Sequence, residues 1–260
     1  MPKPRPSRPR RGRRDARADA QVRAIDSMAG PEKPRQIPLD LSRQPGHSRD
    51  ELVVSDANRQ AVALIDGWPE WPAAVMVLAG PAGSGKSHLA SIWAASANAV
   101  VVDPSEIEDW VEGAPLTHPV VIDDADIDLD ENGLFHLINA ARAAGTHILL
   151  TSRRFPSAWG IRLPDLASRL KAAATVEILE PDDHLLAAVV TKLFADRQVE
   201  VEPHVVQFLV RRIERSLSTA IDVVDRLDRM ALEQKSRITR ALAAQAINAL
   251  DRGQAELDLD

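Results

Sequence analysis

The sequence predicts an α/β fold, namely a parallel five-stranded sheet with helices on both faces, followed by a small all-helical domain. Between residues 51 and 180, short apolar runs alternate with stretches of helical apolar spacing, which indicates parallel strands joined by helices. A glycine-rich loop follows the first apolar run and precedes a helix. After Pro181 the apolar runs stop and only helical spacing continues, so we place the domain boundary at Glu180–Pro181.

The individual elements follow from the period of the apolar residues. Apolar or β-branched runs predict strands at 74–78, 100–102, 120–122, 147–151 and 175–178. Helical spacing predicts helices at 56–65, 86–97, 107–111, 134–144, 182–196, 203–212, 216–232 and 239–250. Asp182 is a candidate N-cap, and Pro203 occupies a first helical position. We therefore expect a disordered basic arm at 1–50, a nucleotide-binding base at 51–180, a helical lid at 181–252 and a free acidic tail at 253–260.

Composition and charge exclude several classes of protein. The chain has no cysteine, which excludes disulfides and thiolate sites and fits a reducing cytosol, so a cytoplasmic location is expected. No apolar run approaches the roughly 18 residues that span a bilayer. The seven histidines show no metal-ligand spacing, so no metal other than Mg²⁺ is expected. The net charge of −6 combines a basic segment 1–35 with an acidic remainder, and an acidic body is a poor DNA-binding domain.

The glycine-rich loop is the strongest chemical signal in the sequence. It matches the pattern G-x-x-x-x-G-K-[ST] in full, with the residues Gly80, Pro81, Ala82, Gly83, Ser84, Gly85, Lys86 and Ser87. Glycines allow backbone N–H groups to approach phosphate oxygens at a helix N-terminus. Lys86 is expected to reach the outer phosphates, and the Ser87 hydroxyl to bind Mg²⁺. The sequence therefore predicts a site for ADP or ATP with Mg²⁺.

A second part of this site is expected after the strand at 120–122. The strand ends in two acids, which would place Asp123 beside the Mg²⁺ ion and allow Asp124 to orient water. An apolar strand followed by Asp is also a common turn. The preceding phosphate loop and the α/β pattern favour the functional interpretation.

A phosphate-loop domain followed by a helical lid is the arrangement of AAA+ proteins. In such proteins an arginine before the last strand is presented to a neighbour's nucleotide, and Arg169 in Leu163–Leu170 occupies that place. Arg215, which opens the run Arg215–Ile221, falls where the sensor-2 arginine contacts nucleotide from the lid. The alternative for each is an ordinary surface arginine.

Residues 50–252 resemble the AAA+ region of the replication initiator DnaA and, more closely, the shorter Hda proteins, which are regulatory inactivators of DnaA. The resemblance rests on Val120–Ser152, on Leu163–Leu170 with the sequence LPDLASRL, and on the lid helix after Arg215. An initiator carries a helix-turn-helix DNA-binding domain after the lid, so a chain that stops there is expected to be an inactivator. The resemblance implies DnaA and the DNA polymerase sliding clamp (beta subunit) as partners, with DNA contacted through the clamp and no membrane partner.

The Hda resemblance also implies a clamp-binding peptide near the N-terminus. Gln36, Leu39 and Leu41 fit its Q-x-x-L-x-L form between two prolines. The glutamine would hydrogen-bond at one subsite while the leucines fill an apolar pocket. A second match, Gln254–Leu259, adds acidic residues and lacks an apolar residue at its second position, so we attribute it to chance or to a secondary clamp contact.

One departure from the resemblance concerns hydrolysis. DnaA-like chains follow Thr-Ser with an acid at the sensor-1 turn, whereas Arg153 and Arg154 follow Thr151–Ser152 here. We therefore expect weak or no ATPase activity in this chain and the activation of hydrolysis on DnaA, with Arg169 as an arginine finger in trans. The expected function is negative regulation of replication initiation at the DNA-loaded clamp. The alternatives are an ATPase of the helicase-loader type and a DNA-binding regulator that uses the basic arm.

Overall fold

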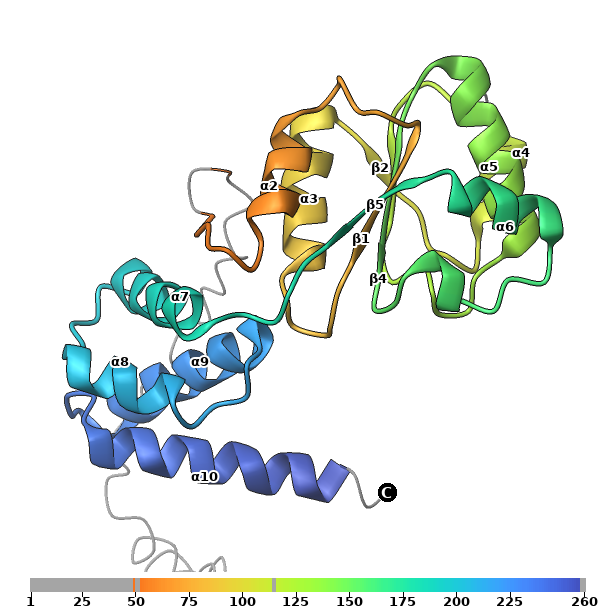
Figure 1. Cartoon of the computed structure of the whole chain (residues 1–260). Helices are drawn as coiled ribbons and strands as arrows, with labels where there is room; N and C mark the ends of the chain where they lie inside the picture. The colour runs from red at the N-terminus through yellow and green to blue at the C-terminus, as the bar shows by residue number, and fades with distance from the viewer. Residues whose placement is uncertain (1–48, 50–51, 114–115, 258–260) are drawn as a thin grey trace, which may run out of the picture. The chain divides into compact units, whose positions relative to one another are not determined.

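Five parallel strands form the central sheet, in the order β2-β3-β4-β1-β5 (Figure 1). Their bounds are β1 Val75–Ala79, β2 Val100–Val101, β3 Val120–Ile122, β4 Ile148–Ser152 and β5 Ala174–Glu177. This computed structural model describes residue 49 and residues 52–113 and 116–257, which belong to one compact unit, Pro45–Asp260. The inner strands β1, β3 and β4 are buried along their whole length, as apolar strands covered on both faces should be.

Helices cover both faces of the sheet. Helices α2 (Arg59–Asp66) and α3 (Lys86–Ala97) lie on one face, and α4 (Ile107–Gly113), α5 (Glu131–Ala144) and α6 (Pro164–Lys171) lie on the other (Figure 1). Because side chains alternate along a strand, Met76 and Leu78 of β1 pack toward α2 and α3, whereas its neighbours Val75 and Val77 pack toward α4–α6. Two apolar layers therefore hold the sheet in place.

The layer beneath α3 contains a tryptophan cluster. Trp93 of α3 is fully buried and stacks on Trp71, with 4.8 Å between ring centroids. Trp68 meets the edge of Trp93 at 6.2 Å, and the Trp71 indole N–H donates to the Leu64 carbonyl oxygen at 2.7 Å. This cluster packs α3 against the sheet, and α3 begins at the lysine of the phosphate loop.

The second domain consists of helices α7 (Asp183–Asp196), α8 (Pro203–Val210), α9 (Leu217–Gln234) and α10 (Arg240–Leu257). These helices enclose their own core, which includes Phe194, Leu209 and Val224. The predicted N-cap is present, since the Asp182 carboxylate accepts from the Leu185 N–H at 2.7 Å. In the described ranges, no helix has the length and apolar character needed to cross a bilayer.

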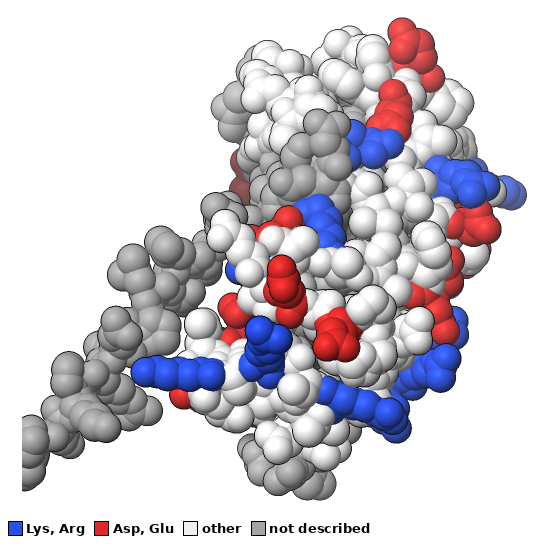
Figure 2. All heavy atoms as spheres, turned by 90° about the vertical axis from the view of Figure 1, so that its left-hand side faces the viewer, with Lys and Arg blue, Asp and Glu red and all other residues white. Residues whose placement is uncertain are grey.

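Charges of both signs occur on the face shown in Figure 2, where Lys and Arg side chains stand among Asp and Glu. Several described side chains pair, such as Lys192 with Asp196 at 2.6 Å and Arg197 with Asp225. A mixed face does not supply the continuous positive surface that attracts DNA phosphates.

Three differences from the sequence-based expectations have local causes. Helix α5 begins at Glu131 and not at residue 134, because Asp130 caps it. Helix α6 was not expected; only Leu166 and Leu170 of its apolar residues are buried, so its apolar period is short. Helix α10 continues to Leu257, which makes part of the expected free tail 253–260 helical.

Two groups of predictions stay untested by the structure. The predicted domain boundaries stay predictions. The residues of the predicted clamp-binding peptide, Gln36, Leu39 and Leu41, lie outside the described residues, as does Leu259 of the second match.

We predict that Asp130→Ala destabilises the base. One Asp130 carboxylate oxygen accepts from the Gly133 N–H at 2.9 Å, which caps α5, and the other accepts from the Glu108 N–H at 2.8 Å, which joins α4. Losing both bonds should lower the free energy of unfolding by about 1–2 kcal/mol. Denaturant unfolding measures this change, with Asp222→Ala on the exposed side of α9 as the control. Equal stability of the two variants would contradict the assignment.

Candidate nucleotide site

The phosphate loop leaves the end of β1 in close contact with two neighbouring strands. The Gly80 N–H donates to the Ser152 carbonyl oxygen of β4 at 3.1 Å. A Cβ atom at Gly80 would lie 2.3 Å from the carbonyl oxygen of Ile178, directly after β5. No side chain fits in that space, so the first glycine of the motif is required by backbone packing.

The middle of the loop contacts the start of the lid helix α9. Gly83 has a φ of +68°, a conformation that favours glycine, and its carbonyl oxygen accepts from the Leu217 N–H at 2.7 Å. A Cβ atom at Gly83 would lie 2.1 Å from Ser216 Oγ and 2.9 Å from Ser218 Oγ. The loop and the first turn of α9 therefore meet without an intervening side chain.

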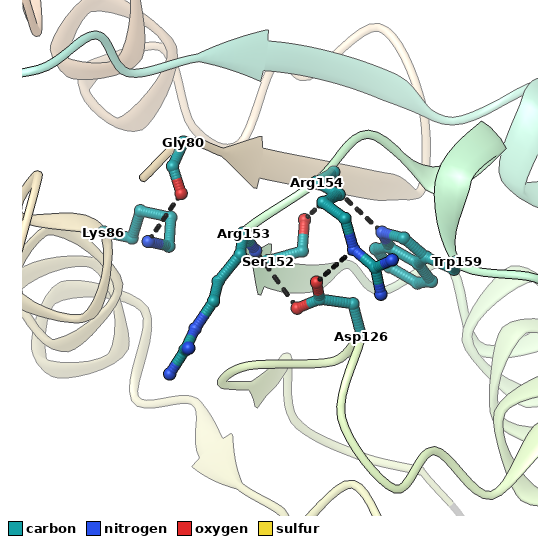
Figure 3. A network of polar contacts seen from close by, with 7 residues as sticks. All are labelled: Gly80, Lys86, Asp126, Ser152, Arg153, Arg154 and Trp159. Atoms are coloured by element: carbon teal, nitrogen blue, oxygen red, sulfur yellow. Dashed lines mark hydrogen bonds and ion pairs between the residues drawn. The ribbon is translucent and has the colours of Figure 1, made fainter. Parts of the chain in front are cut away.

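Lys86 is buried within the loop, with 5% of its surface exposed. Its ammonium group donates to the carbonyl oxygen of Gly80 at 2.9 Å (Figure 3) and to that of Pro81 at 2.8 Å. Burial lowers the pKa of Lys86, and the negative charges of Asp124 and Asp123 partly oppose this shift. The lysine is thus held at the loop, next to the two predicted acids.

The two acids after β3 join the loop to β4. Asp123 Oδ1 accepts a hydrogen bond from Ser87 Oγ at 3.1 Å and another from Thr151 Oγ1. The Thr151 hydroxyl oxygen in turn accepts from the Asp124 N–H at 2.9 Å. Asp124 itself has a φ of +48°, which turns the chain sharply after the strand. The structure therefore brings the predicted residues Lys86, Ser87, Asp123 and Asp124 together.

Oxygen ligands at this position fit Mg²⁺. The ion prefers hard oxygen donors and is usually bound by one or two carboxylates together with substrate phosphates. The Ser87 hydroxyl and the Asp123 carboxylate are donors of that kind. Among the described residues there is no cluster of three or more His, Asp or Glu side chains that could hold a metal without phosphate. Ser87 and Asp123 as Mg²⁺ ligands stay a prediction.

Two residues of this region were not predicted. Thr151 is fully buried and connects both acids; the sequence marks it as part of the sensor-1 turn but does not predict this contact. The side chain of Asp126 is 2% exposed; it accepts from the Arg153 N–H at 3.0 Å and pairs with Arg154 at 3.4 Å (Figure 3). The only sequence signal for Asp126 is its position among several acids after β3.

The two predicted arginines lie in different surroundings. Arg215 precedes α9 and pairs with Asp183 of α7 at 2.9 Å, with more than half of both side chains exposed. The residues that contact the loop are the next ones, Ser216–Ser218. Arg169 lies in α6, where its guanidinium group stacks over the Phe135 ring at 4.7 Å from the centroid. The roles of both arginines toward nucleotide stay predictions.

Comparison with known proteins agrees with this arrangement. Residues 183–246 match the family model described as the Hda lid domain. Over 119 residues the chain is 27% identical to an uncharacterised protein of Haemophilus influenzae. This match covers 45% of this chain and 52% of that protein. The matched part therefore spans about half the length of this relative.

Solved structures show the same fold. Domain III of the Thermotoga maritima replication initiation protein DnaA has a TM-score of 0.70 and 17% identity, covering 79% of this chain and 97% of that one. The structure of the replication initiator DnaA bound to AMPPCP and single-stranded DNA has a TM-score of 0.61 and 16% identity, and the match covers 74% of this chain and 68% of that one. The RuvB Holliday junction branch migration motor of Thermotoga maritima has a TM-score of 0.62 and 20% identity, and the match covers 79% of this chain and 72% of that one.

These comparisons confirm the expected fold class, a five-stranded AAA+ base followed by a helical lid. With the match of residues 183–246 to the Hda lid domain, they support the resemblance to Hda proteins and DnaA that was stated from the sequence.

We predict that Gly83→Ala disrupts the contact between the loop and the lid. Gly145 provides a matched control, because it also has a φ of +68° but no atom within 4 Å of an added Cβ. Gly145→Ala should cost only the left-handed conformation, about 1 kcal/mol. Gly83→Ala should cost more, because Ser216 and the start of α9 must move. Thermal unfolding compares the two variants, and equal losses would contradict the contact.

Proposed function

We propose that this protein is a negative regulator of replication initiation that binds the DNA-loaded sliding clamp and stimulates hydrolysis of ATP bound to DnaA. In this proposal its own nucleotide, ADP or ATP with Mg²⁺, orders the base against the lid. Arg169 then acts on the nucleotide of DnaA. The proposal starts from the Hda-like lid and the DnaA-like base.

The position of Arg169 is the observation that carries the proposal. Leu166 and Leu170 of α6 pack into the apolar layer with α4 and α5, whereas Leu89 and Trp93 of α3 belong to the opposite layer. The sheet thus separates the helix that carries Arg169 from the helix that begins at Lys86. This separation favours a role for Arg169 on a nucleotide outside its own chain.

The immediate environment of Arg169 also suits a contact in trans. Arg169 is partly exposed, and its guanidinium group forms no ion pair with a described carboxylate. The Phe135 ring orients it without neutralising its charge. Such a group can approach a partner's phosphates, where an arginine supplied in trans accelerates phosphoryl transfer by about 10³–10⁵ in well-studied systems.

The site around Lys86 supports nucleotide binding by this chain. Backbone N–H groups of the loop and the Lys86 ammonium group would bind the phosphates, and the Ser87 hydroxyl and Asp123 would hold Mg²⁺. When bound, Mg²⁺ neutralises phosphate charge. The contact between Gly83 and Leu217 gives this loop a direct connection to the lid. Nucleotide at the loop can therefore influence how the lid is held.

Clamp binding rests on the sequence of Gln36, Leu39 and Leu41. Attachment to the clamp raises the local concentration of the protein near replicating DNA. The mixed charges on the face in Figure 2 agree with such indirect contact.

The alternative function is an ATPase of the helicase-loader type. A motor that turns over ATP by itself would show robust hydrolysis without clamp or DnaA, and that result would favour the helicase-loader class.

We predict that Arg169→Ala abolishes the stimulation of DnaA. In an ATP hydrolysis assay with DnaA, DNA-loaded clamp and this protein, the variant should lose most of the rate increase, by about 10³-fold or more if the finger acts alone. Lys171→Ala removes a like charge from the same helix and should stimulate as the unchanged protein does. Normal stimulation by Arg169→Ala would exclude the mechanism even though the fold stands.

We predict that the double change Gln36→Ala, Leu39→Ala prevents clamp binding. Losing the glutamine hydrogen bond and one apolar contact should weaken the affinity at least about tenfold, since 1.4 kcal/mol corresponds to that factor. Surface plasmon resonance on immobilised clamp measures the affinity, with Gln44→Ala as the control outside the motif. Unchanged affinity would remove the assignment, and truncation after Gly253 would then test the second motif at 254–259.

A further inference from the structure

Helix α6, which carries Arg169, begins without a capping side chain of its own. Its N-cap residue is Leu163, whose apolar side chain forms no capping hydrogen bond, and Pro164 follows at the first helical position. The helix has only eight residues, and so short a helix is not stable in water without support from the surrounding fold. The position of Arg169 therefore depends on the contacts that hold α6 in place.

The carboxylate of Glu131, the first residue of α5, holds the start of α6. Its Oε2 atom accepts from the Leu163 N–H at 2.8 Å and from the Arg162 N–H at 3.0 Å, and its Oε1 atom lies 3.1 Å from the same Arg162 nitrogen. The Arg162 side chain is 93% exposed and pairs with the carboxylate only at 3.7 Å, whereas the Glu131 side chain is 19% exposed. Because exposed ion pairs contribute little, the backbone hydrogen bonds are the main link between the two helices at this end.

Phe135 provides a second contact between the same two helices. Glu131 and Phe135 are four residues apart, so they lie on one face of α5, against which α6 packs (Figure 1). The Phe135 ring contacts the guanidinium group of Arg169, in the last turn of α6. Between the two contacts, Leu166 and Leu170 are buried in the apolar layer. Helix α5 therefore holds α6 before its first turn and at its last turn.

We propose that Glu131 is a positioning residue for Arg169. By holding the backbone at the start of α6, it sets where the guanidinium group meets the ATP of DnaA. The inference rests on the proposed function, because it assumes that Arg169 acts on that nucleotide. Glu131 itself touches neither the nucleotide nor the partner, and its effect passes through the backbone of α6.

Loss of the Glu131 contacts should change the rate of hydrolysis more than the affinity for DnaA. Leu166 and Leu170 would stay buried, so α6 would remain attached to the base while its start moves more freely. A displacement of about 1 Å at a group that acts in the transition state can lower a rate by about 10²-fold. An interaction made only in the transition state affects the maximal rate and leaves ground-state binding unchanged.

Hydrolysis of DnaA-bound ATP, measured with DNA-loaded clamp and increasing amounts of the full chain, tests this assignment. Glu131→Ala should lower the maximal stimulated rate by about tenfold to 10²-fold, while the concentration for half-maximal stimulation stays within about threefold. A normal maximal rate with a shifted half-maximal concentration would make Glu131 a docking residue and overturn the assignment. Arg162→Ala keeps the backbone N–H and should stimulate as the unchanged protein does.

Two conservative variants separate backbone anchoring from charge. Glu131→Gln keeps the length of the side chain and a carbonyl oxygen that can accept both N–H groups, so it should recover most of the rate. Glu131→Asp keeps the charge but is one methylene shorter, so its rate should stay near that of Glu131→Ala. Stimulation by Glu131→Asp that equals or exceeds that of Glu131→Gln would overturn the assignment, and this order is decisive even where Glu131→Ala fails to fold.

Two further measurements complete the test. Isothermal titration calorimetry with ADP should give the same affinity for Glu131→Gln, Glu131→Asp and the unchanged protein, and a loss of ADP binding that parallels the loss of rate would show a general loss of structure and overturn the assignment. If Arg169→Ala loses stimulation while Glu131→Ala reaches the normal maximal rate, the positioning role is wrong and the proposed function stands. If Arg169→Ala stimulates DnaA normally, the proposed mechanism is wrong, and the assignment of Glu131 falls with it.

Discussion

The carboxylate of Asp123 holds together the edge of the sheet on which the candidate site depends. It accepts hydrogen bonds from Ser87 at the start of α3 and from Thr151 at the end of β4, while it follows β3 itself. Strand register makes this possible, because β4 pairs in parallel with β3 on one side and with β1 on the other. Three chain segments distant in sequence therefore end at the same place. Without that convergence the glycine-rich loop would be a turn with no partner residues.

The sequence predicted the helices and strands whose bounds are set by their own residues. The strand at 120–122 and the helix at 86–97 have the expected bounds, because an apolar run and a glycine-rich start mark them. Helix α6 was missed since only two of its residues are buried, Leu166 and Leu170. The end of α10 was placed too early, because the apolar spacing that marked the helix stops at Leu250 and glycine is unfavourable inside a helix, yet α10 continues through Gly253 to Leu257.

In the candidate site, too, the residues marked by local sequence were predicted, and those that depend on tertiary contacts were not. The loop residues and Asp123 follow from a motif and from a strand ending in acids. By contrast, the role of Thr151 depends on the pairing of β3 with β4, and the contact of Ser216 with Gly83 depends on how the lid meets the loop. Helical period alone could not tell which residue at the start of α9 faces the loop. Arg215 was chosen because it falls where AAA+ lids carry the sensor-2 arginine, and its partner in the structure is Asp183.

Arg154 and Arg169 illustrate how the surroundings of an arginine decide whether it can serve a partner's phosphate. A guanidinium group paired with a buried carboxylate, as Arg154 is with Asp126, must break that pair before it binds another anion. Arg169 is oriented by an aromatic ring, so its charge stays available to a partner. In the proposed mechanism the first arrangement serves structure, and the second acts on another chain's nucleotide.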